Sequence, residues 1–280
     1  MVINENMIDN FTAELEVATN LVKTAACLHI KGRENPITVY QKGVLDEVTS
    51  TDYAIEKFLV DELLQKFPDD RIISEETHIA EITDERTWVI DPLDGTSNYA
   101  RKIPIYGIQM ALLINKNPVV AVIYLPELEE MYSAAVNQGS YLNDERIYVS
   151  SCGDLNQAIA SMGDFSKGSD RAEKNRVRLA GVCAIANHIN RLKMWGAACY
   201  DLASLASGKT DIYLVYSYDI WDIMPGYLIA KEAGAVFQQL TGEAFDYTAT
   251  TLIGAANIEL INELLELINY REFLDNSTTN

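Results

Sequence analysis

The sequence has few residues of the types that build disulfide scaffolds or thiolate metal sites. Its 280 residues include only four cysteines and three histidines. The cysteines lie far apart without a C-x-x-C pair, and the histidines are equally scattered. These spacings argue against a cysteine-rich fold and against a zinc site held by thiolates. Low cysteine usage is typical of proteins in reducing compartments, so a cytoplasmic location is expected.

The sequence also has little positive charge and no long apolar run. It contains 22 Lys and Arg residues against 41 Asp and Glu residues, which gives a formal net charge of −19. A field of this sign repels nucleic acids and anionic membrane surfaces, so neither is an expected partner. No apolar segment approaches the roughly 18 residues that span a bilayer, and residues 1–6 lack the features of a signal peptide. A phosphorylated small molecule would be repelled too, unless a cation mediated its binding.

The first half of the chain has the patterns of two helices followed by a sheet. Apolar residues at three- and four-residue spacing predict helices over 8–30, ending at Gly32, and over 53–67. Short apolar or alternating runs, separated by Asn, Pro and Gly, then indicate an antiparallel meander. Its predicted strands are residues 88–90, 107–114, 118–124 and 130–134.

Beyond about residue 150, strands and helices alternate, which favours an α/β arrangement. Gly208 is expected to end one helix, and Pro225 to stand in the first turn of another. The predicted strands are 158–162 and 211–216, and the predicted helices are 170–180, 197–206, 225–233 and 259–268. We therefore predict two domains, residues 1–150 and 151–270, followed by a polar tail at 271–280.

One segment concentrates acidic residues at the end of a predicted strand. Residues 88–98 read WVIDPLDGTSN, so the strand leads directly into Asp91 and Asp94. Carboxylates this close together suit a hard cation such as Mg²⁺. Pro92 stiffens the turn between them, and Gly95 lets a ligand approach the backbone. The alternative is a plain turn between two strands, whose aspartates accept hydrogen bonds from the backbone.

Other acidic residues stand at comparable positions. Glu75 and Glu76 follow an apolar run, whereas Asp52 and Asp222 stand near the starts of predicted helices. Taken singly, Asp52 and Asp222 are typical of helix N-caps. Their appearance together with the acidic turn favours a shared site instead.

The order and spacing of these elements resemble the magnesium-dependent, lithium-sensitive phosphatases of the inositol monophosphatase family, over nearly the whole chain. The resemblance rests on V-T-x-x-D at 48–52, the acid pair at 75–76, D-P-L-D-G-T at 91–96, G-A-A at 196–198 and W-D at 221–222. It implies a mixed α/β fold, a layered α-β-α-β-α sandwich with the site between the two halves. It also implies two or three Mg²⁺ ions per site, with Asp91 bridging two of them. The implied metal ligands are Glu75, Asp91, the carbonyl of Leu93, Asp94 and Asp222.

The resemblance assigns further roles around these ligands. Thr96, with Asp52 nearby, would orient the attacking water, so that Asp52, Glu75 and Thr96 form the catalytic group. The N–H groups of Gly95 and Thr96 would bind phosphate oxygens. Glu76 would lie behind the metal ligands, and the substrate would be contacted by Gly196 and Ala198.

The substrate side departs from the family's pattern. Family members that act on inositol phosphate commonly carry an acidic residue seven positions before the metal-binding Asp of the W-D element, where it contacts sugar hydroxyls. Here that position is Val215, with hydrogen-bonding side chains nearby at Tyr216, Ser217 and Asp219. The small residues usual after the W-D element are replaced by Met-Pro at 224–225. The metal and phosphate residues are thus present, whereas the identity of the substrate is left open.

These observations predict a Mg²⁺-dependent phosphomonoesterase that acts on inositol monophosphate or a related polyol or sugar phosphate. Alternatives with the same chemistry are fructose 1,6-bisphosphate, a nucleotide 3′-phosphate and histidinol phosphate. A different class is a non-catalytic or regulatory protein that binds phosphorylated ligands or a protein partner. By resemblance, we also expect a homodimer and sensitivity to Li⁺.

Overall fold

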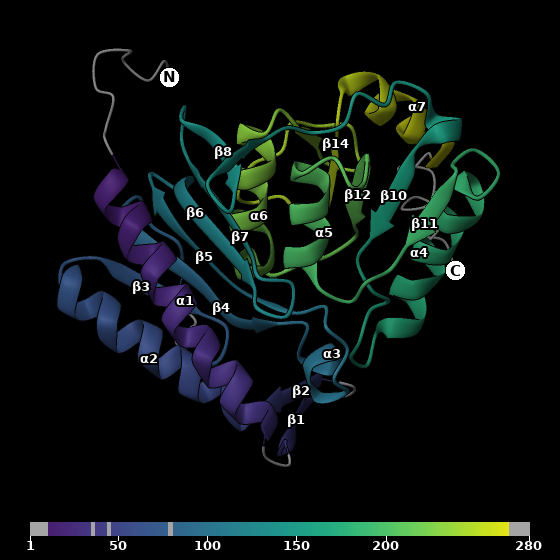
Figure 1. Cartoon of the computed structure of the whole chain (residues 1–280). Helices are drawn as coiled ribbons and strands as arrows, with labels where there is room; N and C mark the ends of the chain where they lie inside the picture. Colours follow the sequence, from purple (N-terminus) through teal and green to yellow (C-terminus); the bar gives the residue numbers. More distant parts are fainter. Residues whose placement is uncertain (1–10, 35–36, 44–45, 78–80, 269–280) are drawn as a thin grey trace.

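Two β-sheets and three pairs of helices alternate in five layers (Figure 1). The computed structural model describes residues 11–34, 37–43, 46–77 and 81–268. Helices α1 and α2 cover the outer face of the first sheet, α5 and α6 lie between the sheets, and α4 and α7 cover the second sheet. The predicted α-β-α-β-α sandwich is therefore confirmed.

The first sheet has seven strands in the order β3-β4-β5-β6-β7-β8-β9. Strand β3 is parallel to β4, and every other neighbouring pair is antiparallel, which confirms the predicted meander. The strands are β3 (Arg71–Ser74), β4 (Thr87–Asp94), β5 (Gly107–Ile114), β6 (Asn117–Leu125), β7 (Glu130–Ala135), β8 (Gly139–Leu142) and β9 (Glu145–Ile147). The last two were not predicted, because strands of three or four residues carry little periodicity.

Alternating side chains of β4 serve two different cores. Trp88 and Ile90 pack against α1 (Thr12–Glu34) and α2 (Ser50–Lys66), whereas Val89 points to the middle layer. Successive strand residues face opposite sides of a sheet, so a strand buried on both faces is apolar throughout. This double burial holds the end of β4 rigidly in the centre of the molecule. A short hairpin of β1 (Val39–Gly43) and β2 (Asp46–Thr49) precedes α2.

The second sheet has five strands in the order β11-β10-β12-β14-β13. Strand β10 is parallel to both of its neighbours, and β14 is antiparallel to both of its own. The strands are β10 (Ile159–Met162), β11 (Arg191–Lys193), β12 (Ile212–Val215), β13 (Val236–Gln238) and β14 (Leu252–Ala255). Its outer face is covered by α4 (Arg171–Ile185) and α7 (Ile258–Ile268).

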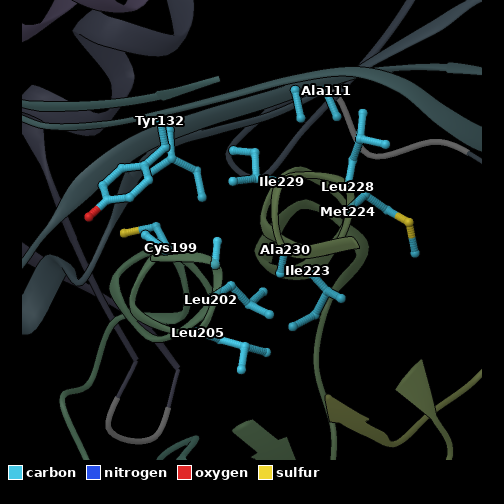
Figure 2. Close-up of a cluster of buried hydrophobic side chains, with 14 of the residues drawn as sticks. Ala111, Tyr132, Cys199, Leu202, Leu205, Ile223, Met224, Leu228, Ile229 and Ala230 are labelled. Carbon is cyan, nitrogen blue, oxygen red and sulfur yellow. The ribbon is translucent and has the colours of Figure 1, made fainter. Parts of the chain in front are cut away.

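Helices α5 (Ala198–Ala206) and α6 (Ile220–Glu232) form the middle layer. Figure 2 shows Leu202 of α5 lying between the two helices, near Ile223 of α6. The helices touch closely because Gly226 has no side chain: a Cβ there would lie 2.4 Å from the Cβ of Leu202. Burying a leucine or isoleucine side chain contributes about 1.5 to 3 kcal/mol, so this cluster sets the position of both helices.

Several predicted boundaries were wrong. Helix α6 begins at Ile220 instead of 225, with Pro225 inside the helix, and α4 continues to Ile185 instead of 180. Gly32 lies within α1 and does not end it. In each case tertiary packing outweighs the local preference of a Pro or Gly residue. The predicted start of the first helix at residue 8 and the tail at 271–280 lie outside the described residues.

The predicted domain boundary near residue 150 falls between β9 and the short 3-10 helix η1 (Leu155–Gln157), and the division into two domains stays a prediction. Within the described ranges, every helix is too short or too polar to traverse a bilayer.

Replacing Gly32 with alanine is expected to destabilise the protein. Inside a helix this change ordinarily stabilises by about 1 kcal/mol. Here the new Cβ would lie 2.4 Å from the Tyr99 hydroxyl and 2.5 Å from Oγ1 of Thr51. Overpacking of this kind costs about 1 to 3 kcal/mol, measurable as a lower free energy of unfolding in urea. Gly153→Ala is the control, because a Cβ at Gly153 meets nothing within 4 Å; equal stability of both variants would contradict the expectation.

Candidate active site

A cavity of about 890 Å³ lies between the two sheets and collects most of the predicted site residues. Its walls come from the end of β4, the first turns of α5 and α6, and the loop at 163–168. The predicted residues that line it are Glu75, Asp91, Leu93, Asp94, Gly95, Thr96, Gly196, Ala198 and Asp222. Asp52 lies behind the wall and reaches the site through Thr96 Oγ1, which donates to its Oδ1 at 3.3 Å.

The turn after β4 lets other parts of the backbone lie very close to it. Pairing with β5 is irregular between Asp91 and Asp94, and the Leu93 N–H donates to Asp91 Oδ1 at 3.1 Å. Gly95 has a φ of +87°, and a Cβ there would lie 3.0 Å from the carbonyl oxygen of Ile105. A left-handed conformation in such a small space requires glycine. The backbone bond to Asp91 fits the plain-turn alternative, but the gathering of other carboxylates around this turn does not.

Taken singly, the positions of Asp52 and Asp222 predict helix N-caps. The structure shows that neither residue caps its helix. Each is the third residue of its helix, and the caps are Thr49 and Asp219. Asp52 Oδ2 accepts from the Thr49 N–H at 2.9 Å, and Asp222 Oδ2 accepts from the Asp219 N–H at 3.1 Å. An acidic residue at the third position commonly binds back to the cap in this way. One carboxylate oxygen of each residue is thereby fixed, which orients the other.

Negative charge accumulates beside this turn. Burial raises the pKa of Asp91 and Asp222 well above the ordinary range, and repulsion from Glu75 and Asp94 raises both further. Burial also raises the pKa of Asp94 to about 6, although the Cys199 N–H donates to its Oδ2 at 2.5 Å. Like charges held together out of water favour the protonated state of each carboxyl group. The ionised forms of these aspartates are therefore destabilised unless positive charge lies nearby.

Two side chains offset part of this charge. Lys42 on β1 forms ion pairs with Glu75 at 3.0 Å and with Glu76 at 2.6 Å. The Gln109 amide donates to Asp91 Oδ2 at 3.3 Å and to Asp94 Oδ2 at 3.5 Å. In this arrangement, no group of three or more acidic, histidine or cysteine side chains in the described part of the chain is close enough together to hold a metal ion.

The donor set nevertheless fits a hard divalent cation. The four carboxylates and the Leu93 carbonyl offer only oxygen atoms, which Mg²⁺ prefers over nitrogen and sulfur. The raised pKa values of Asp91, Asp94 and Asp222 show that positive charge would be stabilising at this point. The residues that could hold such ions are Glu75, Asp91, Leu93, Asp94 and Asp222.

Comparison with known proteins identifies the family of this chain. Residues 12–270 match the model of the inositol monophosphatase family. The chain is 34% identical over 267 residues to inositol monophosphatase 3 of Solanum lycopersicum, covering 91% of this chain and 96% of that one. The chain belongs to the inositol monophosphatase family. It is thus a phosphoric monoester hydrolase by family.

Further relatives span the same length. Among solved structures, an IMPase of Thermotoga maritima matches with a TM-score of 0.84 and 27% identity, covering 94% of this chain and 99% of that one. A protein of Escherichia coli strain K12 named Nus factor SuhB is 32% identical over 254 residues, covering 90% of this chain and 94% of that one. The family's fold therefore extends over nearly the whole chain.

Sequence reasoning missed several residues that support the family's site. Glu56 accepts from the Ser74 hydroxyl at 2.7 Å and from the Glu76 N–H at 2.8 Å, and so holds the segment that carries Glu75. It stands four residues after Asp52, on the same side of α2, and that spacing was an available signal. Gln109 was visible as the single polar residue of the apolar run 107–114. Lys42 and Cys199 carried no local signal, because their partners are distant in sequence.

The residues around position 215, which we expect to lie near the substrate, are only partly in the cavity wall. Val215 lines the cavity, as do Ser217 and Asp219, whereas Tyr216 lies outside its wall. Ser217 Oγ accepts from Arg178 Nη2 at 2.7 Å.

The metal-free protein is expected to lose stability as pH rises from about 4 to 6. Asp52 and Asp94 have pKa values of about 6 in the folded protein, against about 3.9 in an unfolded chain. The folded state therefore holds protons that the unfolded chain releases, and the free energy of unfolding falls over this interval. Saturating Mg²⁺ should reverse the trend, because it binds the ionised carboxylates.

Thermal unfolding midpoints at pH 4 and pH 6, in chelator and in Mg²⁺, measure this effect. Asp94→Asn should show a smaller fall between the two pH values, since one of the titrating groups is gone. The same fall in wild type and variant would contradict the electrostatic account.

Proposed function

We propose that this protein hydrolyses the phosphate monoester of a polyol, with inositol monophosphate as the substrate, in a Mg²⁺-dependent reaction. The observation that carries the proposal is the cluster of carboxylates at the cavity, in which Asp91 is buried and Glu75, Asp94 and Asp222 are half-buried. It lies next to the hydrogen-bonded pair of Thr96 and Asp52. Membership of the inositol monophosphatase family supports it.

The proposed metal ligands are Glu75, Asp91, the Leu93 carbonyl, Asp94 and Asp222, which would hold two or three Mg²⁺ ions. When bound, such ions lower the pKa of a water molecule and neutralise charge on the phosphate. Without them, the carboxylates of this cavity would repel the substrate. The requirement for a cation therefore follows from the residues themselves.

Thr96 and Asp52 are suited to orient the attacking water. The single hydroxyl proton of Thr96 is directed to the Leu93 carbonyl at 3.0 Å or to Asp52 Oδ1 at 3.3 Å. Its oxygen thus remains an acceptor toward the cavity, where it can hold a water proton and leave a lone pair of that water for phosphorus. Asp52, with a pKa of about 6, is ionised at neutral pH and keeps the Thr96 proton in place.

The phosphate and the alcohol group of the substrate would contact different parts of the cavity wall. We assign the N–H groups of Gly95 and Thr96 to the phosphate oxygens, since both residues line the cavity beside the carboxylates. Gly196 and Ala198 line the wall near the start of α5 and are assigned to the alcohol group of the substrate.

Replacing Asp91 with asparagine tests the proposal. Phosphate release would be measured on inositol 1-phosphate, fructose 1,6-bisphosphate, a nucleotide 3′-phosphate and histidinol phosphate, with Mg²⁺ and with chelator. We expect activity that requires Mg²⁺ and falls about a hundredfold or more in Asp91→Asn, because a central charge of the site is removed. Asp144→Asn is the matched control, since Asp144 is exposed on the turn between β8 and β9.

The possible results separate the alternatives. Full activity in excess chelator would falsify the metal-dependent mechanism. Hydrolysis confined to a nucleotide or a bisphosphate would overturn the polyol assignment alone. Failure to hydrolyse any of the esters would favour a non-catalytic or regulatory protein that binds phosphorylated ligands.

Inhibition by Li⁺ is a further expectation from the family resemblance. Initial rates on the preferred ester should fall when LiCl replaces NaCl at equal ionic strength in the millimolar range. A rate that is the same in both salts would count against it.

We also propose a homodimer, on the family resemblance alone. Light scattering during size exclusion should give twice the mass of one chain, and a monomeric mass at micromolar concentration would oppose it.

A further inference from the structure

A polar side chain lies on the buried inner face of the first sheet, beside the turn that carries the proposed metal ligands. Gln109 belongs to β5, whose other residues are apolar, and it is completely buried. Its side chain faces the middle layer, because Ala111 and Leu113, at alternate positions of the strand, pack there. A buried amide costs free energy unless it is hydrogen-bonded, so its partners indicate what it does.

The strand pairing brings Gln109 next to the acidic turn. Gln109 stands opposite Asp91 in the ladder between β4 and β5. Directly opposite residues of antiparallel strands have their side chains on the same face of the sheet. Beyond this pair the register is irregular, since Asp94 is opposite Gly107 and β4 has an extra residue. Such a bulge bends the strand, and the long side chain of Gln109 reaches both Asp91 and Asp94.

The amide nitrogen of Gln109 contacts three oxygen atoms. Nε2 donates to Asp91 Oδ2 at 3.3 Å, to Asp94 Oδ2 at 3.5 Å and to the backbone carbonyl of Asp222 at 3.3 Å. These distances exceed the usual value of about 2.9 to 3.0 Å, as expected where two amide protons are shared among three acceptors. A carbonyl oxygen can only accept, so the nitrogen of the amide must face Asp222.

These contacts join two elements that carry proposed ligands. Asp91 and Asp94 belong to the end of β4, whereas Asp222 belongs to the first turn of α6. Asp91 has a donor on each carboxylate oxygen, because the Leu93 N–H donates to its Oδ1 at 3.1 Å. A carboxylate bound at both oxygens is restricted in rotation, so the orientation of Asp91 depends in part on Gln109.

The other end of the Gln109 amide does not stabilise the fold. Oε1 is buried and has no hydrogen-bond partner among the described residues. A buried acceptor without a donor destabilises the folded state, and an apolar side chain of similar size would avoid that cost. The glutamine is therefore better explained by the contacts of its nitrogen with the acidic site than by the stability of the sheet.

We propose that Gln109 is a positioning residue for the metal ligands. Its amide orients the carboxylates of Asp91 and Asp94 and ties both to the start of α6, which carries Asp222. This inference rests on the proposed metal-dependent function and adds to it a residue that binds no ion itself. Donors behind ligand carboxylates set their orientation, and losing one typically weakens metal binding or activity by about ten- to a hundredfold.

Gln109→Met tests this role, because methionine has a similar length but cannot donate a hydrogen bond. Mg²⁺ binding to the metal-free protein would be measured by calorimetry, and unfolding by urea would be measured in chelator. We expect the Mg²⁺ dissociation constant to rise about tenfold or more. The free energy of unfolding in chelator should change little, since the unpartnered Oε1 is removed together with the donor. A purely structural role predicts the reverse, a large loss of stability with unchanged Mg²⁺ affinity.

Two further variants make the result specific. Gln109→Asn keeps an amide but is one methylene shorter, so contacts that are already long would be lost. It should also weaken Mg²⁺ binding, and it replaces Gln109→Met if that variant does not fold. Met110→Leu is the control, because Met110 packs on the opposite face of β5 among residues of α1 and α2, and it should bind Mg²⁺ as the wild type does. An unchanged or smaller Mg²⁺ dissociation constant in either Gln109 variant would overturn the positioning role.

Failure of the proposed function gives a different result. A wild type that binds no Mg²⁺ would overturn the metal-dependent function and the role of Gln109 together. A wild type that binds Mg²⁺ but hydrolyses none of the esters would overturn the phosphatase function alone, because the calorimetric comparison needs no substrate. A wild type that binds Mg²⁺ and hydrolyses an ester, with unchanged Mg²⁺ affinity in the Gln109 variants, would overturn the role of Gln109 alone.

Discussion

Mutual repulsion among closely spaced carboxylates is the constraint on which the rest of this site depends. Asp91, Asp94 and Asp222 are held near one another and near Glu75, and burial raises the pKa of the three aspartates. The protein tolerates this arrangement because donors surround it. Gln109, the N–H of Cys199 and the ammonium group of Lys42 each offset part of the charge. The cost of holding the acids together would make the cavity receptive to divalent cations and, through them, to phosphate, as we propose.

The layered fold supplies the rigidity that such an arrangement requires. Strand β4 is buried on both faces, so its end is fixed by two separate cores. Helices α5 and α6 pack on each other around Leu202 and Gly226 and present their first turns at the cavity (Figure 2). Repulsive groups therefore stay in place, because moving them would disrupt well-packed apolar layers.

The sequence by itself determined the parts of this protein whose signals are local. Continuous apolar runs predicted β4, β5 and β6, and helical spacing predicted α2 and α7. The acidic turn at 91–96, together with the order and spacing of the other motifs, indicated the family. Strands β8, β9 and β11 escaped prediction, because their short sequences contain no continuous apolar run. The local pattern predicts a helix end at Gly32, whereas the role of Gly32 is to let α1 pass close to Tyr99. Only the tertiary structure showed that Thr96 donates a hydrogen bond to Asp52, that Glu56 holds the segment that carries Glu75, and that Gln109 donates to Asp91 and Asp94. Local patterns report backbone preference and burial, but contacts between residues tens of positions apart depend on how the layers pack, and no local pattern contains that information.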